Sequence, residues 1–439
     1  MTTSESPKPK RILIGLRDIA GYGSALKRGF DEIGQPAEFL DLGGSRFDYS
    51  RSGGSAFVRT LSSGIGSIGR LFNGNFALRF AWMSVLQPAI GLLLLPYALA
   101  RFDAFVLLSG SNFFYFLELP LMRLCGKKVI HVYLGSDSRP AYLNGYVTGP
   151  LASRRRVFAS SALALVQKAN VRFVETFATA TLNTPPQALF HARPFVNLFR
   201  VGLPIEIPRD EPSSAGKRPV TILHAPSKAL PKRSAEIERL VEEARAEGFD
   251  VRFVRIENQP NHEVLRALRD CDLVIDEVYS DTPLSKFATE AAARGRPALV
   301  GGYYATEIGK DLPAEAIPPS FFCAPETLKE TLFAILREPE SRARKGEAAR
   351  AYVARHWADS VVARKFLSVF AGAFDRNWIV DPKRMTYVRG CGLSEAEASR
   401  NLRLLLRGLG AWAMWMGHHP HLESELVALS RKFPEASDR

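Results

Sequence analysis

Short apolar runs alternate with longer amphipathic runs along this chain, in two stretches separated by a polar segment. A short apolar run followed by a run whose apolar positions recur every three to four residues is typical of a strand followed by a helix. In the first stretch we expect strands at residues 11–16, 37–42, 105–108, 129–132, 171–174 and 179–182, and a helix at 116–124. In the second we expect strands at 220–225, 251–256, 273–276 and 298–300, and helices at 234–247, 261–269 and 283–294. This alternation predicts an α/β protein with parallel sheets.

The length of 439 residues exceeds what one ordinary core supports and suits two domains. A segment rich in Pro, Gly and Ser lies between the two alternating stretches and predicts a linker. We therefore place an N-terminal domain at residues 1–208, a linker at 209–219, a second domain at 220–355, a closing helix at 356–374 and a helical extension at 375–439.

The net charge of +13 is concentrated in one region. Residues 51–156 carry twelve Lys and Arg against three acids, and the same region is rich in Phe, Leu, Trp and Tyr. Cations beside apolar surface suit an anionic membrane face. A basic surface without a specific partner is the alternative. No nucleic-acid-binding module is recognisable, so we do not expect nucleic acid as a partner.

The region 80–100 contains no charged residue and reaches the length of a membrane span. Pro88 and Pro96 interrupt it, so we expect two helical pieces instead. The four cysteines have no paired spacing for zinc or a disulfide framework, and the polar, basic N-terminus lacks an apolar signal core. We expect a cytoplasmic protein, for which peripheral attachment to the inner face of the cell membrane is one option.

A basic loop follows the expected strand at 220–225 and precedes a helix. It contains Ser227, Lys228, Lys232 and Arg233. Several cations in a strand-end loop form a cradle for an anion, and a phosphate would fit. The alternative is a solvated basic turn.

The segment at 273–301 runs from a buried strand into a carboxylate-bearing helix. Asp281 or Thr282 can cap this helix, with Pro283 at its first position. The amides of the first turn, including those near Ser285 and Lys286, suit a phosphate. Glu290 lies two turns along, where it can accept from a sugar hydroxyl. This geometry suits a nucleotide sugar. An ordinary exposed helix acid is the alternative for Glu290.

The first stretch offers glycines and polar residues after its strands. Gly21 and Gly23 follow the first strand and would let a ligand approach the backbone. His131 lies in the strand at 129–132, and Gly135, Asp137 and Arg139 lie in the loop after it. Strand ends of this kind converge on a cleft. Asp137 can instead cap the segment that follows.

These segments, in this order, resemble those of GT-B glycosyltransferases, and specifically the family-4-like retaining transferases. The resemblance covers about residues 11–374 and depends on the order of the segments more than on any one of them. It is carried by GKKVIHVYLGSDSR in the first half and by ILHAPSKALPKRS, DLVIDEVYSDTPLSKFATEAAARGRPAL and ARAYVARHW in the second.

The resemblance implies two Rossmann-like domains that face each other across a cleft, with a C-terminal helical extension. Lys232 falls on the lysine that contacts the donor diphosphate, and Glu290 on the glutamate that binds the donor ribose. Residues implied for the donor site are Ser227, Lys228, Lys232, Arg233, Ser285, Lys286 and Glu290. Residues implied for the acceptor site are Gly21, Gly23, Gly135 and Arg139, and those implied for catalysis are His131, Asp137 and Glu290.

The implied activity is transfer of a sugar from a nucleotide-diphosphate sugar to a glycan or lipid-linked acceptor, in the synthesis of cell-envelope polysaccharide or glycoconjugates. We expect neither a cofactor nor a metal ion, because no Asp-x-Asp motif of the metal-dependent kind appears and no His/Cys cluster suggests zinc. A retaining outcome is implied by the resemblance alone.

The chain departs from the family pattern in three places. Residues 281–285, Asp-Thr-Pro-Leu-Ser, replace the paired glycines of the donor loop. Thr282 stands where the family often has a first glutamate, and Ser227 stands in place of an arginine. These departures favour a catalytically inactive GT-B protein that binds a glycan or acts as a scaffold, whereas Lys232 and Glu290 favour a transferase. A nucleotide-sugar epimerase of related fold is a third alternative.

Overall fold

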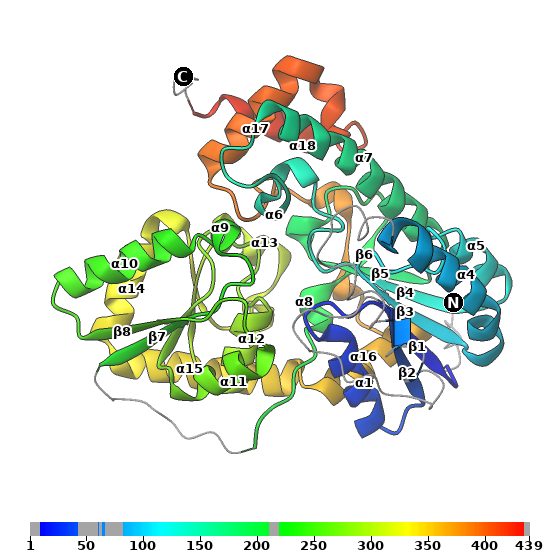
Figure 1. Ribbon diagram of the computed structural model, residues 1–439, viewed down its shortest axis with the longest axis horizontal. Coiled ribbons are helices and arrows are strands. Elements are labelled where there is room, and N and C mark those ends of the chain that lie inside the picture. Colours follow the sequence, from blue (N-terminus) through cyan, green and yellow to red (C-terminus); the bar gives the residue numbers. More distant parts are fainter. Residues whose placement is uncertain (1–8, 43–59, 61–63, 66–81, 210–218, 434–439) are drawn as a thin grey trace.

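The computed structural model describes residues 9–42, 60, 64–65, 82–209 and 219–433, and two α/β domains lie side by side in it (Figure 1). The first domain has a seven-stranded sheet in the order β12-β6-β5-β4-β3-β1-β2, and the second a five-stranded sheet in the order β11-β10-β9-β7-β8. All strands except β12 pair in parallel. The predicted architecture of two Rossmann-like domains is confirmed.

In the first domain the strands read as continuous apolar runs because helices cover both faces of the sheet. Every residue of β1 and β3 is buried. The strands are β1 (Ile12–Leu16), β2 (Ala37–Asp41), β3 (Ala104–Leu108), β4 (Lys128–Val132), β5 (Ala180–Asn183) and β6 (Phe195–Asn197). The helices are α1 (Tyr22–Glu32), α4 (Gln87–Arg101), α5 (Glu118–Leu124), α6 (Gly145–Thr148), α7 (Arg154–Phe177) and α8 (Leu198–Val201).

The strand predicted at 171–174 is wrong, because these residues belong to the helix α7. Val171 and Val174 are both buried, three positions apart, which places them on one helical face against the core. The interruption predicted for 80–100 is not observed, because a short π-helix at Trp82–Leu86 continues directly into α4, and α4 runs through Pro96. In the described parts of the chain, no helix has both the length and the apolar character needed to cross a membrane.

The second domain follows the predicted alternation closely. Its strands are β7 (Val220–His224), β8 (Val251–Arg255), β9 (Leu273–Ile275), β10 (Ala298–Gly301) and β11 (Phe321–Cys323). Its helices are α9 (Ala229–Lys232), α10 (Ser234–Ala246), α11 (Asn261–Asp270), α12 (Lys286–Ala293), α13 (Ile308–Asp311), α14 (Leu328–Arg337) and α15 (Pro339–His356). The predicted linker lies outside the described residues except for its two ends.

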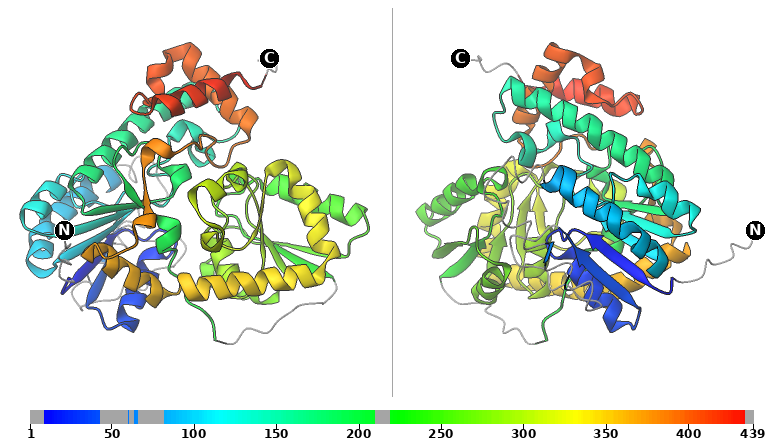
Figure 2. Two further views of the ribbon diagram at one scale, coloured as in Figure 1. Left: turned by 180° about the vertical axis from the view of Figure 1, so that it is seen from behind. Right: turned by 45° about the vertical axis from the view of Figure 1, so that its right-hand side comes forward.

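After α15 the chain returns to the first domain. α16 (Asp359–Ala371) packs against α1, and Figure 2 shows α15 leading into it along one edge of the molecule. The approach is close, because a Cβ on Gly29 would lie 2.0 Å from the carbonyl oxygen of Asp359. The second domain is therefore tied to the first by this helix as well as by the linker.

The C-terminal extension is also fixed to both domains. β12 (Ile379–Val380) pairs antiparallel with β6, and α17 (Glu395–Leu409) packs on α7 and on α18 (Pro420–Arg431). The amide of Gly392 donates to the carbonyl of Tyr279 in the second domain at 2.7 Å. The extension therefore spans the junction of the two domains.

In each sheet the chain begins at an inner strand and places the strands that follow on both sides of it. β1 pairs with both β2 and β3, and β7 pairs with both β8 and β9. In open parallel sheets, ligands bind at the carboxyl ends of the strands where the strand order changes direction in this way. The loops after β1, β4, β7 and β9 are therefore the expected walls of a site.

Candidate functional site

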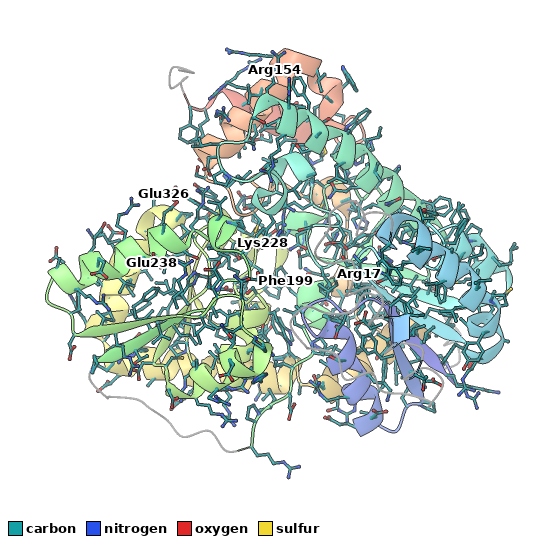
Figure 3. All side chains as sticks on the ribbon, viewed as in Figure 1. Arg17, Arg154, Phe199, Lys228, Glu238 and Glu326 are labelled. Atoms are coloured by element: carbon teal, nitrogen blue, oxygen red, sulfur yellow. The ribbon has the colours of Figure 1, made fainter. Side chains whose placement is uncertain are left out.

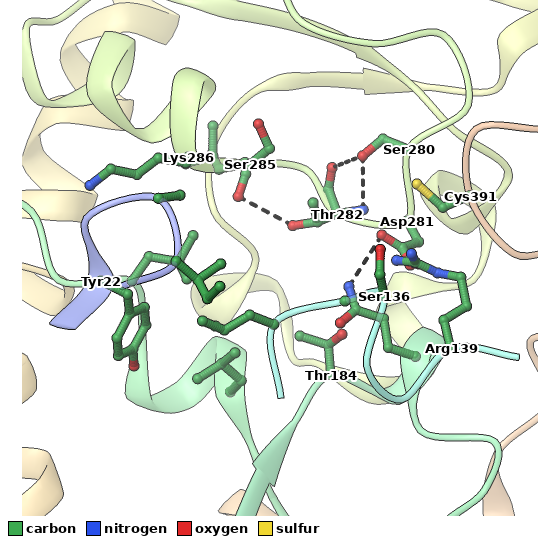
Figure 4. Close-up of a pocket in the computed structure, with 18 of the residues that line it drawn as sticks. Tyr22, Ser136, Arg139, Thr184, Ser280, Asp281, Thr282, Ser285, Lys286 and Cys391 are labelled. Atoms are coloured by element: carbon green, nitrogen blue, oxygen red, sulfur yellow. Dashed lines mark hydrogen bonds and ion pairs between the residues drawn. The ribbon is translucent and has the colours of Figure 1, made fainter. Parts of the chain in front are cut away.

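Two adjoining chambers lie between the domains, of about 400 Å³ and about 450 Å³. The first, shown in Figure 4, is lined mainly by the loops after β1, β4, β5 and β9. The second is lined by the loops after β1, β7 and β8 and by the start of α12. Their common wall consists of Ile19, Ala20, Tyr146, Ser227, Glu277, Ser285 and Lys286. A ligand can therefore extend from one chamber into the other.

A buried cation marks the second chamber. Lys232, at the end of α9, lines this chamber and forms an ion pair with Asp276, which follows β9. Asp276 also accepts a hydrogen bond from the Ser285 hydroxyl. Burial alone would lower the pKa of Lys232, but the attraction of Asp276 outweighs it and the pKa lies above its usual value. The ammonium group therefore stays charged.

The helix that carries Glu290 begins later than predicted. α12 starts at Lys286 with Ser285 as its N-cap, not at Pro283. Side-chain turns hold the preceding loop, since the Ser280 hydroxyl accepts from the amide of Thr282 and the Thr282 hydroxyl donates to the carbonyl of Leu284. The first-turn amides of α12, which have no intrahelical acceptor, consequently belong to residues 286–288.

Glu290 lies one turn along α12 and lines the second chamber. Its Oε1 atom accepts from Asn261 at 3.3 Å and lies 3.9 Å from the Lys286 ammonium. Burial raises its pKa. The structure thus brings Lys232, Ser285, Lys286 and Glu290 together around one chamber.

The other residues predicted for the donor occupy different positions. Ser227 lines both chambers, whereas Lys228 is exposed near the junction of the domains, as Figure 3 shows, and is not among the lining residues. Arg233 is directed to the extension, where it forms an ion pair with Glu397 and lies over the ring of Tyr279 at 5.2 Å. Its local structural role is to hold α17.

Gly135 and Arg139 line the first chamber, but Arg139 is already paired. Its guanidinium donates to Asp281 of the second domain, through Nε at 2.9 Å and through a terminal nitrogen, and Gln187 donates to the same carboxylate at 3.3 Å. Both charged side chains are buried. Figure 4 shows this pair at one end of the chamber. Arg139 therefore joins the two domains across the cleft.

Asp137 and His131 line neither chamber. Asp137 accepts from the amide of Leu134 at 3.3 Å, so it organises the loop before it and not the segment that follows, and burial raises its pKa to about 6. His131 is buried within β4 between the rings of Phe116 and Tyr133. Burial lowers the pKa of His131 to about 3, so its ring is neutral.

Gly21 and Gly23 also lie outside the two sets of lining residues. Gly21 has a φ of 74° at the N-cap of α1, a conformation that favours glycine. A Cβ on Gly23 would lie 2.6 Å from the ring of Phe39, so this glycine permits close packing of α1 on the sheet. Their neighbours Ile19, Ala20 and Tyr22 reach the chambers instead.

Comparisons with known proteins give distant structural likenesses. No protein-family model and no curated protein sequence matches the chain. Solved structures similar to it include HepE of Anabaena in complex with UDP-glucose, with 11% identity over 83% of this chain and 100% of that chain and a TM-score of 0.45. TarM of S. aureus, in complex with fondaparinux, α-GlcNAc-glycerol and UDP, has 11% identity over 63% and 58% of the chains and a TM-score of 0.43. The glycosyltransferase SnogD of Streptomyces nogalater has 14% identity over 83% and 100% and a TM-score of 0.40. Structural likeness at this level does not establish a function, so the evidence for one has to come from the residues of the cleft.

Glu277 is a cleft residue that sequence reasoning missed. It lies two residues after β9 on the wall that the two chambers share. Its Oε1 atom accepts from the Tyr146 hydroxyl at 2.8 Å and from the thiol of Cys391 at 3.5 Å. Burial raises the pKa of Glu277 to about 7. The only signal in the sequence is a carboxylate that directly follows an apolar strand.

Cys391 and Asp18 were missed for a different reason. Cys391 belongs to the C-terminal extension, for which the sequence predicts no site residue, yet it lines the first chamber. Asp18 follows β1 and lines the second chamber from the first-domain side. Both positions depend on contacts that only the folded chain brings about.

Proposed function

We propose that the protein is a GT-B glycosyltransferase that moves a sugar from a nucleotide-diphosphate sugar to a hydroxyl of a glycan or lipid-linked acceptor. The observation that carries this proposal is the second chamber. There a buried ammonium, the amides at the start of α12 and a carboxylate one turn further along that helix line one cavity. Cations and free amides fit a diphosphate, and a carboxylate beyond them fits the hydroxyls of a ribose.

The diphosphate is the leaving group, and its charge grows as the bond to the sugar breaks. Lys232, Lys286 and the first-turn amides of α12 supply fixed positive charge where that charge develops. The base would lie along the loop after β8 and the start of α11. Ile256 and Val264 offer apolar contact there, and Asn258 and Gln259 offer amide groups.

The transferred sugar would enter the first chamber past Glu277. This chamber combines the apolar side chains of Leu198, Phe199 and Trp357 with polar groups from both domains. Aromatic and apolar surfaces pack against sugar rings while polar groups bind hydroxyls, so the chamber suits a hexosyl group and the reacting end of an acceptor.

Turnover of a panel of UDP-, GDP-, CDP- and ADP-sugars, with water and simple alcohols as acceptors, tests this proposal. We expect one nucleotide family to release its nucleoside diphosphate, because the leaving group is what the second chamber stabilises. Binding without release would favour the inactive GT-B alternative, which Thr282 and Ser227 support. An isomerised sugar on intact nucleotide would indicate an epimerase. Either outcome contradicts the transferase.

We also propose that the first domain rests on the anionic inner face of the cell membrane, where lipid-linked and envelope acceptors occur. Apolar side chains project from α4 and α5, with Leu93 80% exposed and Leu124 85% exposed. Arg123 is exposed and Lys127 half-buried, and both lie near Leu124 in the sequence, so the surface combines apolar and cationic groups. Of the basic residues counted in this region, those at 51, 59, 70 and 79 lie outside the described residues.

The double substitution Leu93→Gln/Leu124→Gln is expected to weaken binding to vesicles of phosphatidylcholine and phosphatidylglycerol by tenfold or more. Removing two leucines from contact with lipid forfeits on the order of 2 kcal/mol or more. Vesicle flotation measures the effect. The control Leu230→Gln, an exposed leucine of the second domain, should change nothing. Equal binding of all three proteins, or binding that does not need the anionic lipid, would contradict the membrane proposal.

A further inference from the structure

Glu277 carries a carboxyl group on the wall that the two chambers share. Its Oε1 atom accepts from the Tyr146 hydroxyl of the first domain at 2.8 Å and from the Cys391 thiol of the extension at 3.5 Å. Figure 4 shows Cys391 beside Asp281 at one end of the first chamber. The two domains and the extension therefore all help to position this one carboxyl group.

The two oxygens of Glu277 have different surroundings. Oε1 accepts both hydrogen bonds, and a hydrogen on Oε1 would compete with these donors, so the acid form of Glu277 carries its hydrogen on Oε2. The Oε2 atom accepts no hydrogen bond from the described part of the chain, and it is not among the sealed polar atoms that lack a partner there. It therefore borders the open cavity, where the acid form offers an O–H group to a ligand.

A diphosphate bound as proposed lies next to this oxygen. Glu277 lines the second chamber together with Lys232 and Lys286, and it also faces the first chamber, into which the sugar extends. It is thus placed where the diphosphate and the sugar join. An ionised carboxylate would repel the diphosphate there, whereas a carboxylic acid donates a hydrogen bond to it, and such a bond is strong because its acceptor is ionised. A bound sugar nucleotide therefore favours the acid form.

The groups around Glu277 already hold it close to protonation. Burial raises its pKa, Lys232 lowers it, and Asp276 and Asp281 raise it again, to about 7. A bound anion therefore needs to raise this pKa only modestly to protonate the group. The pKa values of Tyr146, Lys232 and Cys391 lie above their usual values, so these three groups do not change charge near neutral pH. The charged and titratable groups that face Glu277 are Arg139, Tyr146, Lys232, Asp276, Asp281, Lys286 and Cys391.

We propose that Glu277 binds the sugar nucleotide as a carboxylic acid and donates its Oε2 hydrogen to the diphosphate, next to the oxygen that carries the sugar. This inference rests on the proposed function. Solvent supplies the proton when the sugar nucleotide binds to the ionised form. The hydrogen bond strengthens as the bond to the sugar breaks, because negative charge then grows on the diphosphate. The proton returns to solvent when the nucleoside diphosphate leaves.

Two substitutions separate donation of a hydrogen bond from the presence of a charge. Glu277→Gln keeps an oxygen for Tyr146 and Cys391 and places an amide N–H where the acid has its hydrogen, so this variant imitates the acid form at every pH. Its affinity for the sugar nucleotide at about pH 8 should equal or exceed that of the wild type. Glu277→Ala removes the hydrogen-bonding group and should bind about tenfold or more weakly than Glu277→Gln. Thermal unfolding shows whether both variants are folded.

The pH dependence of binding reports on the proton itself. Wild-type affinity should fall about tenfold between about pH 6 and about pH 8, because the ionised form of Glu277 must take up a proton before it can donate. Glu277→Gln should show no such fall. The probes are UDP-glucose, GDP-mannose, CDP-glucose and ADP-glucose, whose phosphates are diesters and keep their charge over this range. Calorimetry in two buffers of different ionisation enthalpy should give about one proton taken up per sugar nucleotide at about pH 8 for the wild type, and almost none for Glu277→Gln.

Asp18→Asn is the matched control. Asp18 lines the second chamber from the first domain, and burial raises its pKa to about 6. Asparagine keeps an acceptor for the Gly23 amide, and this variant should retain the proton uptake at about pH 8. Proton uptake that persists in Glu277→Gln, a wild-type affinity that is the same at both pH values, or loss of proton uptake in Asp18→Asn would overturn the role of Glu277. Failure of the wild type to bind any of the four sugar nucleotides would instead overturn the proposed function.

Discussion

Lys232→Met is expected to weaken the binding of the nucleoside diphosphate by roughly 10- to 100-fold, because a hydrogen bond to a charged group contributes about 1.5–3 kcal/mol. The ammonium group lines the second chamber and is held there by Asp276. Calorimetric titration measures the change. The matched control is Lys228→Met, which removes an exposed cation from the same loop and should leave the affinity nearly unchanged.

A second variant keeps loss of binding distinct from loss of folding. Lys232→Met alone leaves Asp276 as an unpaired buried charge, which typically costs about 3–5 kcal/mol. The double variant Lys232→Met/Asp276→Asn removes that charge as well, so it should recover stability without recovering affinity. Wild-type affinity in the double variant, or an equal loss in Lys228→Met, would show that the diphosphate does not lie at Lys232.

Arg139→Met is expected to lower the free energy of unfolding by about 3–5 kcal/mol, because it leaves the buried carboxylate of Asp281 without its cation. Gln187 remains as a partner for that carboxylate but carries no charge. Urea denaturation measures the loss. Arg139→Met/Asp281→Leu, which removes both charges, should recover much of it.

The matched control for this ion pair lies on the surface. Arg344 and Glu340 are 3.5 Å apart on α15 and both exposed, so Arg344→Met should cost at most about 1 kcal/mol. If Arg139→Met costs no more than the control, the pair between the domains contributes little to holding them together.

The alternation of strands and helices was predictable from the sequence because it depends on local pattern. In the second domain each expected strand is present within a residue or two. The error at α7 has a physical cause. Val171, Phe173 and Val174 are typical of a strand, but Val171 and Val174 also share one face of a helix, and packing on the core decides between the two.

Part of the cleft was predictable because strand-end loops converge there in any parallel sheet. Lys232, Ser285, Lys286 and Glu290 reach one chamber for that reason. The partner of a buried side chain was not predictable in this way. Arg139 is paired with a residue 142 positions away, and no local pattern indicates this.

The carboxylates that the sequence did not reveal show the same limit. Asp18 and Glu277 both follow an apolar strand, which is a signal shared by many ordinary residues. Their raised pKa values come from burial between two domains. A local sequence pattern does not predict this burial.

The central claim is that the second chamber binds a nucleoside diphosphate. Calorimetric titration of the wild-type protein with UDP, GDP, CDP and ADP tests it most directly. The account predicts saturable binding of one of the four, weakened by Lys232→Met. Absence of binding by all four would contradict it and would leave a two-domain protein whose cleft serves another ligand.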